Sequence, residues 1–135
     1  MIFGMDQHAG RTAIRTDRGE SLLYSDLFEV MRRISTDLGD RKEVAICLCE
    51  NSVDCVAGYL SFLDRGIVPI ILGAQIEPSF VQDYIDEYRP RYIWKPQSFS
   101  LEVTGFSRAR MQEDYELLIS PGRQRTSAGT FGTRR

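Results

Sequence analysis

The sequence contains little histidine and cysteine, and this scarcity excludes several kinds of chemistry. Its 135 residues include one histidine, His8, and three cysteines, Cys47, Cys49 and Cys55. A single histidine cannot supply a Ser/His/Asp triad or a histidine-rich zinc site. Cys47 and Cys49 would share one face of a strand, and Cys55 alone does not complete a zinc or redox set. We therefore interpret the cysteines as buried free thiols, which are typical of a reducing cytoplasm.

The sequence also lacks an excess of either charge and any long apolar run. Lys and Arg number 17 and Asp and Glu 19, for a formal net charge of −2. This balance gives no electrostatic reason to expect binding to nucleic acid or to an anionic membrane. No run approaches the roughly 20 apolar residues of a membrane-spanning helix, and residues 1–11 do not have the pattern of a signal peptide. We expect a cytoplasmic protein with one small domain.

The first forty residues have the pattern of a β-hairpin followed by a helix. Residues 13–16 and 20–24 are β-like, and Gly19 between them can supply the turn. Ser25 is a suitable N-cap, and the apolar residues after it recur at helical spacing as far as Leu38. Gly39 is then expected to end the helix in a left-handed conformation.

Three short apolar segments between residues 43 and 95 predict a parallel sheet. Residues 44–49 (VAICLC) form a continuous apolar run, which is typical of a strand buried on both faces. Residues 67–72 (IVPIIL) predict a second buried strand, in which Pro69 indicates a bulge or an edge position. Residues 92–94 predict a third strand.

Helical segments connect these strands, as right-handed βαβ crossovers require. The first is capped by Asn51 or Ser52 and ends at Gly66, and the second starts near Glu77 and stops before Pro90. The expected apolar stripes are Val53, Val56, Ala57, Leu60 and Leu63 on the first helix and Phe80, Val81, Tyr84, Ile85 and Tyr88 on the second. Residues 115–119 (YELLI) predict one more strand, whereas residues 97–112 show no clear period. The predicted fold class is α/β, a small parallel sheet with flanking helices, preceded by a β-hairpin.

The order of these segments resembles the amino-terminal part of the adenylate-forming (AMP-binding) ligases, the family of acyl-CoA synthetases and of the adenylation domains of non-ribosomal peptide synthetases. The motifs are SLLYSDL at 21–27, VAICLCENSVDCVAGYLSFLDRG at 44–66, IVPIIL at 67–72, RPRYIW at 89–94 and YELLIS at 115–120. They cover residues 11–120. The resemblance implies a parent enzyme that uses ATP and Mg²⁺ to activate a carboxylic acid as an acyl-adenylate, with CoA or a carrier protein as the acceptor.

The sequence departs from this family after its last predicted strand. The family continues with a Ser/Thr/Gly-rich loop ending in lysine, in which backbone N–H groups and a cation hold phosphates. Here the sequence reads SPGRQRTSAGTFGTRR, which contains a displaced candidate phosphate loop without the lysine. The candidate residues are Thr126, Ser127, Gly129, Thr130 and Gly132. The composition of residues 121–135 otherwise predicts a disordered Ser/Gly/Arg-rich tail.

Other polar and aromatic groups are interpreted as structural. Asp83, Asp86 and Glu87 are expected on the solvated face of the third helix, since a magnesium site would need a phosphate-bearing ligand beside them. His8 is expected to be solvated. An aromatic cluster is expected for core packing or for a partner-facing patch, rather than for stacking on nucleic-acid bases. Its members are Tyr84, Tyr88, Tyr92 and Trp94.

The sequence thus predicts an amino-terminal fragment of an AMP-dependent synthetase/ligase, truncated before the catalytic motifs. We expect it to be inactive by itself, with no catalytic residue, no metal and no cofactor of its own. One alternative is a stand-alone α/β interaction module, and an orphaned half would self-associate through exposed apolar surface. The other is an unrelated flavodoxin-like nucleotide-binding protein, although no strand is followed by a G-x-G-x-x-G or P-loop lysine motif.

Overall fold

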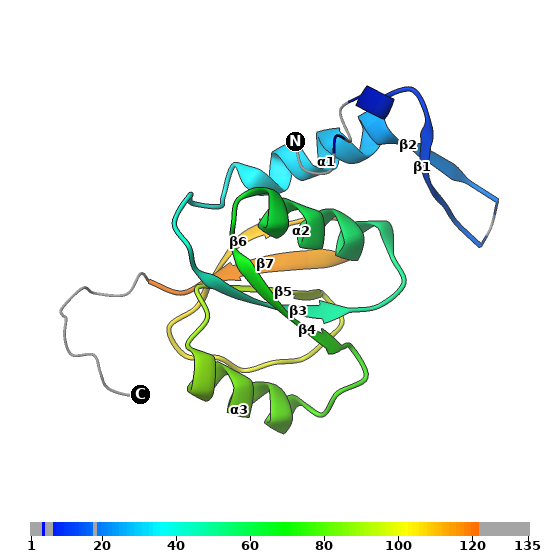
Figure 1. Ribbon diagram of the computed structural model, residues 1–135. Helices are drawn as coiled ribbons and strands as arrows, with labels where there is room; N and C mark the ends of the chain where they lie inside the picture. Colours follow the sequence, from blue (N-terminus) through cyan, green and yellow to red (C-terminus); the bar gives the residue numbers. More distant parts are fainter. Residues whose placement is uncertain (1–3, 5–6, 18, 122–135) are drawn as a thin grey trace.

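The predicted β-hairpin is formed by the first two strands, β1 (Thr12–Arg15) and β2 (Ser21–Leu23). The computed structural model describes residues 4, 7–17 and 19–121, and Figure 1 shows how their elements are arranged. β1 pairs antiparallel with β2. Gly19 in the turn has a φ of +83°, a conformation that glycine adopts without strain. The hairpin prediction is confirmed.

The first helix, α1 (Tyr24–Ser35), differs from the prediction at both ends. It begins at Tyr24, with Leu23 as N-cap, because the Asp26 carboxylate accepts the Leu23 N–H at 3.1 Å and Ser25 lies inside the helix. It ends before Thr36, and Gly39 does not close it. Instead, the Gly39 N–H donates to the Tyr92 hydroxyl at 2.9 Å. The assignments of Ser25 and Gly39 as caps were therefore wrong.

The centre of the protein is a five-stranded sheet with the order β4-β3-β5-β7-β6. β3 (Val44–Cys49) pairs in parallel with β4 (Val68–Gly73) on one side and β5 (Tyr92–Pro96) on the other. This confirms the predicted parallel sheet. β7 (Tyr115–Ile119) adds antiparallel to β5, and β6 (Ser107–Met111) adds antiparallel to β7. β6 was not predicted, because its sequence SRARM is polar and largely exposed and so has no apolar alternation.

Two helices connect the parallel strands and lie on opposite faces of the sheet (Figure 1). α2 (Val53–Asp64) lies on the face that also carries α1, whereas α3 (Pro78–Tyr88) covers the other face. Ser52 caps α2 by accepting the Cys55 N–H at 3.1 Å, and Gly66 follows its end with a φ of +76°. Both helices therefore lie where the βαβ pattern placed them.

The predicted apolar stripes of α2 and α3 were correct only in part. α2 lies between α1 and the sheet, so it is buried on two sides, and its buried residues include polar ones. They are Asp54, Cys55, Ala57, Gly58, Ser61 and Phe62. Val56 was expected in the core but is 38% exposed. On α3 only Val81 is buried, while Phe80 and Tyr88 are 55% and 49% exposed.

β4 occupies one edge of the sheet, as Pro69 indicated. Its residues are half-buried or exposed rather than buried on both faces, which corrects the prediction of a second buried strand. Proline is tolerated here because a residue at an edge can direct its missing N–H away from the neighbouring strand.

Candidate functional site

The candidate phosphate loop of the sequence lies outside the residues that the structure describes. Thr126, Ser127, Gly129, Thr130 and Gly132 belong to residues 122–135, as does nearly all of the predicted tail. The remaining candidate sites are the cavities and polar clusters of residues 4, 7–17 and 19–121.

The acidic group of the third helix is solvated as expected. Asp83, Asp86 and Glu87 are all exposed on α3. No group of three or more His, Cys, Asp or Glu side chains within the described part of the chain could hold a metal ion. His8 is half-buried, with its ring centroid 6.2 Å from that of Tyr24, so it is less solvated than the sequence predicted.

The four predicted cluster aromatics do not form one cluster, because they lie on opposite faces of the sheet. Tyr84 and Tyr88 stack on each other along α3, with ring centroids 6.1 Å apart. Tyr92 and Trp94 lie in the core beneath α1 and α2, where Trp94 contacts the ring of Tyr115 at a centroid distance of 5.1 Å. Residues two apart on a strand share a face, so Tyr92 and Trp94 belong together, and only the link to α3 was wrong.

A group of thiols and a phenol lies at the carboxyl end of β3. Cys49 is the last residue of the strand, Cys55 lies in the first turn of α2, and the Tyr115 hydroxyl comes from β7. That hydroxyl donates to the Leu48 carbonyl at 2.6 Å and accepts the Glu50 N–H at 3.2 Å. All three cysteines are free, Cys47 and Cys55 being buried and Cys49 half-buried. The prediction of buried free thiols is confirmed, apart from this partial exposure of Cys49.

This environment suppresses thiolate chemistry. The Cys49 thiol donates a hydrogen bond to Cys47, and this bond, together with burial, raises the pKa of Cys49 from 9.0 to about 11. The pKa of Cys55 is raised chiefly by its hydrogen bond to Cys49 and then by burial. The thiolate is the nucleophile and metal ligand of cysteine, so raised pKa values make both thiols unreactive near neutral pH.

The second polar cluster runs across three strands on the α3 face. Lys95 of β5 and Glu116 of β7 are cross-strand neighbours, and their Nζ and Oε2 atoms are 2.6 Å apart. Lys95 Nζ also donates to the carbonyls of Phe99, at 2.7 Å, and Pro96, at 3.3 Å. Arg108 of β6 reaches the other oxygen of Glu116 at 3.3 Å. The Lys95 and Glu116 side chains are nearly buried, whereas that of Arg108 is half-exposed.

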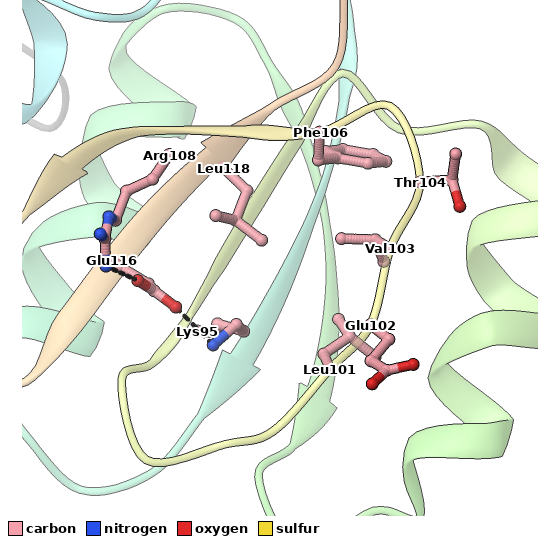
Figure 2. A pocket seen from close by; sticks show the side chains of 9 residues that line it. All are labelled: Lys95, Leu101, Glu102, Val103, Thr104, Phe106, Arg108, Glu116 and Leu118. Carbon is pink, nitrogen blue, oxygen red and sulfur yellow. Dashed lines mark hydrogen bonds and ion pairs between the residues drawn. The ribbon is translucent and has the colours of Figure 1, made fainter.

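An open groove of about 590 Å³ borders this cluster (Figure 2). Lys95, Glu116 and Arg108 form one wall, and the segment from Leu101 to Phe106 forms the other. A neighbouring groove of about 600 Å³ lies between the same segment and α3. The three donor hydrogens of Lys95 already have three acceptors, so this ammonium is not free to bind a phosphate. Among the lining side chains, Arg108 at the exposed margin and the Thr104 hydroxyl still offer donors to the groove.

The sequence patterns did not predict that Lys95, Glu116 and Tyr115 form polar contacts in the core. A lysine inside the strand segment YIWKP and a glutamate inside YELLI are signals, because charged residues seldom occupy buried strands without a partner. Their pairing depends on the register between β5 and β7, which are separated by residues 97–114 and are not related by a local turn. The sequence thus indicated that each of these two charged residues needs a partner, but it did not indicate that they partner each other.

The first turn of α2 is also internally satisfied. In doubly wound sheets, ligands bind outside the carboxyl ends of the strands, and β3 leads there into α2. Ser52 accepts one backbone donor of this turn, and Asp54 adds a carboxylate that meets the positive end of the helix dipole. The Asp54 carboxylate in turn accepts the Asp114 N–H at 2.9 Å. The polar side chains of this turn thus bond to backbone groups of the protein itself.

Comparison with solved structures finds the same fold in adenylate-forming enzymes. The N-terminal subdomain of Klebsiella oxytoca NpsA superposes with a TM-score of 0.61 at 14% identity, over 71% of this chain and 26% of that one. ATP-bound MatB from Rhodopseudomonas palustris gives 0.53 at 23% identity, over 62% and 17%. A benzoate CoA ligase from Burkholderia xenovorans gives 0.52 at 25% identity, over 64% and 18%.

These similarities concern the fold, which is that of the N-terminal subdomain of adenylate-forming enzymes. The resemblance seen in the sequence motifs thus agrees with the three-dimensional arrangement. The chain spans between 17% and 26% of the length of these solved chains. No protein-family model matches the sequence. No curated protein matches it either. Among the described residues, no helix is both long and apolar enough to cross a bilayer.

Proposed function

We propose that residues 11–120 form the amino-terminal scaffold of an AMP-dependent synthetase/ligase. In this proposal the complete enzyme activates a carboxylic acid with ATP and Mg²⁺ as an acyl-adenylate and passes the acyl group to CoA or a carrier protein. The observation that carries it is the superposition on the N-terminal subdomain of NpsA over 71% of this chain. The ATP-bound state of MatB, which has the same fold, supports ATP as the nucleotide. The free thiols support a reducing compartment, the cytoplasm.

We further propose that the 135-residue chain does not activate an acid by itself. Stabilising the charge of a transferring phosphoryl or adenylyl group needs preorganised cations or backbone donors aimed at it. Within the described residues, Lys95 is held by Glu116 and two carbonyls, and the first turn of α2 is held by Ser52 and Asp54. These groups stabilise the fold rather than a ligand. The phosphate clamp and the acid pocket would then come from other parts of the ligase.

Calorimetric titration of the purified 135-residue chain with ATP and Mg²⁺ tests this proposal. The expected result is no saturable heat. Saturable binding that disappears in the Gly129→Ala/Gly132→Ala variant, but persists in the Gly10→Ala control, would contradict it and would identify residues 126–132 as a working phosphate loop. A parallel titration with a flavin nucleotide tests the flavodoxin-like alternative. Tight binding of the flavin would favour a flavodoxin-like protein over a ligase scaffold.

A further inference from the structure

The two edges of the central sheet are protected very differently. β6, at one edge, carries a register shift between Arg108 and Arg110 and two charged side chains. Bulges and charges are the usual devices that prevent an edge strand from pairing with another chain. β4, at the other edge, is a regular six-residue ladder against β3, and its sequence VPIILG has no charge. Within residues 4, 7–17 and 19–121, β4 is therefore the less protected edge of this sheet.

The backbone of β4 presents alternate residues outward. The N–H groups of Val68 and Ala74 donate to Glu43 and Cys49, so the even-numbered residues of the strand face β3. Residues on a strand alternate in direction, so the outward groups belong to Pro69, Ile71 and Gly73. Pro69 has no N–H, which leaves three outward carbonyls and two outward donors.

This outward pattern is complementary to itself in one antiparallel register. When Ile71 faces its own copy, the two Ile71 residues exchange both N–H···O=C bonds. Each Gly73 N–H then meets a Pro69 carbonyl of the other strand, which completes four hydrogen bonds. A register centred on Pro69 would place two residues without N–H groups opposite each other, and proline therefore favours the register centred on Ile71.

Exposed apolar side chains flank the same edge on both faces. Ile71 pairs with Cys47, on the side of α1 and α2, and is 51% exposed. On the other side, Gln82 of α3 donates to the Glu102 carbonyl, so that flank of α3 faces the segment before β6. Phe80, Tyr84 and Tyr88 repeat every fourth residue on the opposite flank of α3, where Phe80 and Tyr88 are exposed. Exposed aromatic side chains therefore lie on the flank of α3 that faces away from the segment before β6.

We propose that a second copy of this chain occupies the edge, through antiparallel pairing of β4 with β4 about a two-fold axis at Ile71. The apolar side-chain area available on Val68, Ile71, Phe80 and Tyr88 is roughly 400 Å² per chain, about half of what each partner buries in a standard interface. An area of this size suits a weak, reversible dimer rather than an obligate one. The pairing joins two five-stranded sheets into one.

Sedimentation equilibrium of the 135-residue chain tests the dimer without nucleotide, so its outcome is separate from that of the ATP titration. Ile71→Lys places a charge at the two-fold axis and is expected to weaken association about tenfold or more. Gly73→Pro removes an outward donor but no bond to β3, and is expected to weaken it too. Met111→Lys introduces the same charge at the other edge, at similar exposure, and should leave association unchanged. Circular dichroism of each variant verifies that the fold is retained.

Cross-linking tests the register directly. Facing residues of a hydrogen-bonded antiparallel pair have Cα atoms about 5.5 Å apart, within the range of a disulfide. Oxidised Ile71→Cys is expected to migrate as a covalent dimer that reductant dissociates, whereas Met111→Cys stays monomeric. A wild-type chain that remains monomeric at several hundred micromolar would overturn the proposal. So would a dimer that tolerates both Ile71→Lys and Gly73→Pro, or one in which Ile71→Cys fails to cross-link.

Discussion

The indole ring of Trp94 lies directly against the Cα atom of Gly58. A Cβ atom at position 58 would meet three atoms of that ring well inside van der Waals contact. The Nε1–H of Trp94 donates to the Asp54 carbonyl of the same helix at 3.0 Å, which fixes the ring in place. Gly58 is therefore the point at which α2 approaches β5 closely enough for the core to close.

Gly58→Ala is expected to destabilise the fold, although alanine is the better helix former. In an open helix this change would stabilise by about 1 kcal/mol. Here the added methyl group must displace a fully buried tryptophan, and overpacking of this kind costs about 1–3 kcal/mol or more. We expect a net loss of about 1–2 kcal/mol in the free energy of unfolding, measured by urea denaturation.

Two further variants show whether the indole causes this loss. Gly10→Ala makes the same chemical change where a Cβ would meet no atom within 4 Å, and it should stay near wild type. The double variant Gly58→Ala/Trp94→Leu should be less destabilised than the sum of the single changes, because the smaller side chain makes room for the methyl group. Simple additivity would show that the Gly58–Trp94 contact is not the cause.

Breaking the Lys95–Glu116 pair is expected to cost far more than breaking a surface pair. Glu116→Ala leaves the ammonium of Lys95 buried with only two carbonyl partners, at a cost of about 3 kcal/mol in the free energy of unfolding. Glu29→Ala removes the exposed ion pair with Arg32 and should cost about 0.5 kcal/mol or less.

An apolar replacement of the pair separates its two contributions. Lys95→Met/Glu116→Leu removes both charges together and should recover most of the stability lost in Glu116→Ala. If the double variant is as unstable as Glu116→Ala, the bonds from Lys95 to the Phe99 and Pro96 carbonyls, rather than the charge pairing, hold the segment after β5.

Local patterns were enough to predict the hairpin and the β3–α2–β4–α3–β5 unit. Each of these elements depends on signals a few residues apart, such as the apolar run of β3 or the glycine after α2. The prediction failed where an element is shaped by distant parts of the chain. The stripe assigned to α2 assumed one buried face, but packing against both α1 and the sheet buries Asp54 and Ser61 as well.

The polar clusters show the same limit. Lys95 and Glu116 are adjacent only because β7 pairs antiparallel with β5 in one particular register. Tyr115 reaches the carboxyl end of β3 through that same pairing, although the two segments are more than 60 residues apart. One-dimensional patterns specify which residues form a strand but not which strands are neighbours, so these contacts could not be predicted.

Alkaline pH is expected to destabilise the protein through the groups at the end of β3. The pKa of Cys49 is raised to about 11. Burial raises the pKa of Tyr115, and the hydrogen bond with Cys49, followed by burial, raises the pKa of Cys55. Each is an acid that keeps its proton to a higher pH in the folded state than in the unfolded state. The unfolded state therefore releases protons first as the pH rises above about 9, the ordinary thiol value, and stability falls from there.

Urea denaturation between pH 7.5 and 10.5 measures this dependence. The free energy of unfolding should be level below pH 9 and should decline from there to the end of the range, because the folded-state pKa of Cys49 lies higher, near 11. Cys55→Ala removes the raised thiol of Cys55 itself and its raising effect on the pKa of Tyr115. These two losses should outweigh the loss of the hydrogen bond by which Cys55 lowers the pKa of Cys49, so stability should decline less steeply over the same range. The prediction is contradicted if stability stays constant or rises between pH 9 and 10.5. It is also contradicted if the slope is unchanged in Cys55→Ala. Either result would show that these groups do not retain their protons to a higher pH in the folded state.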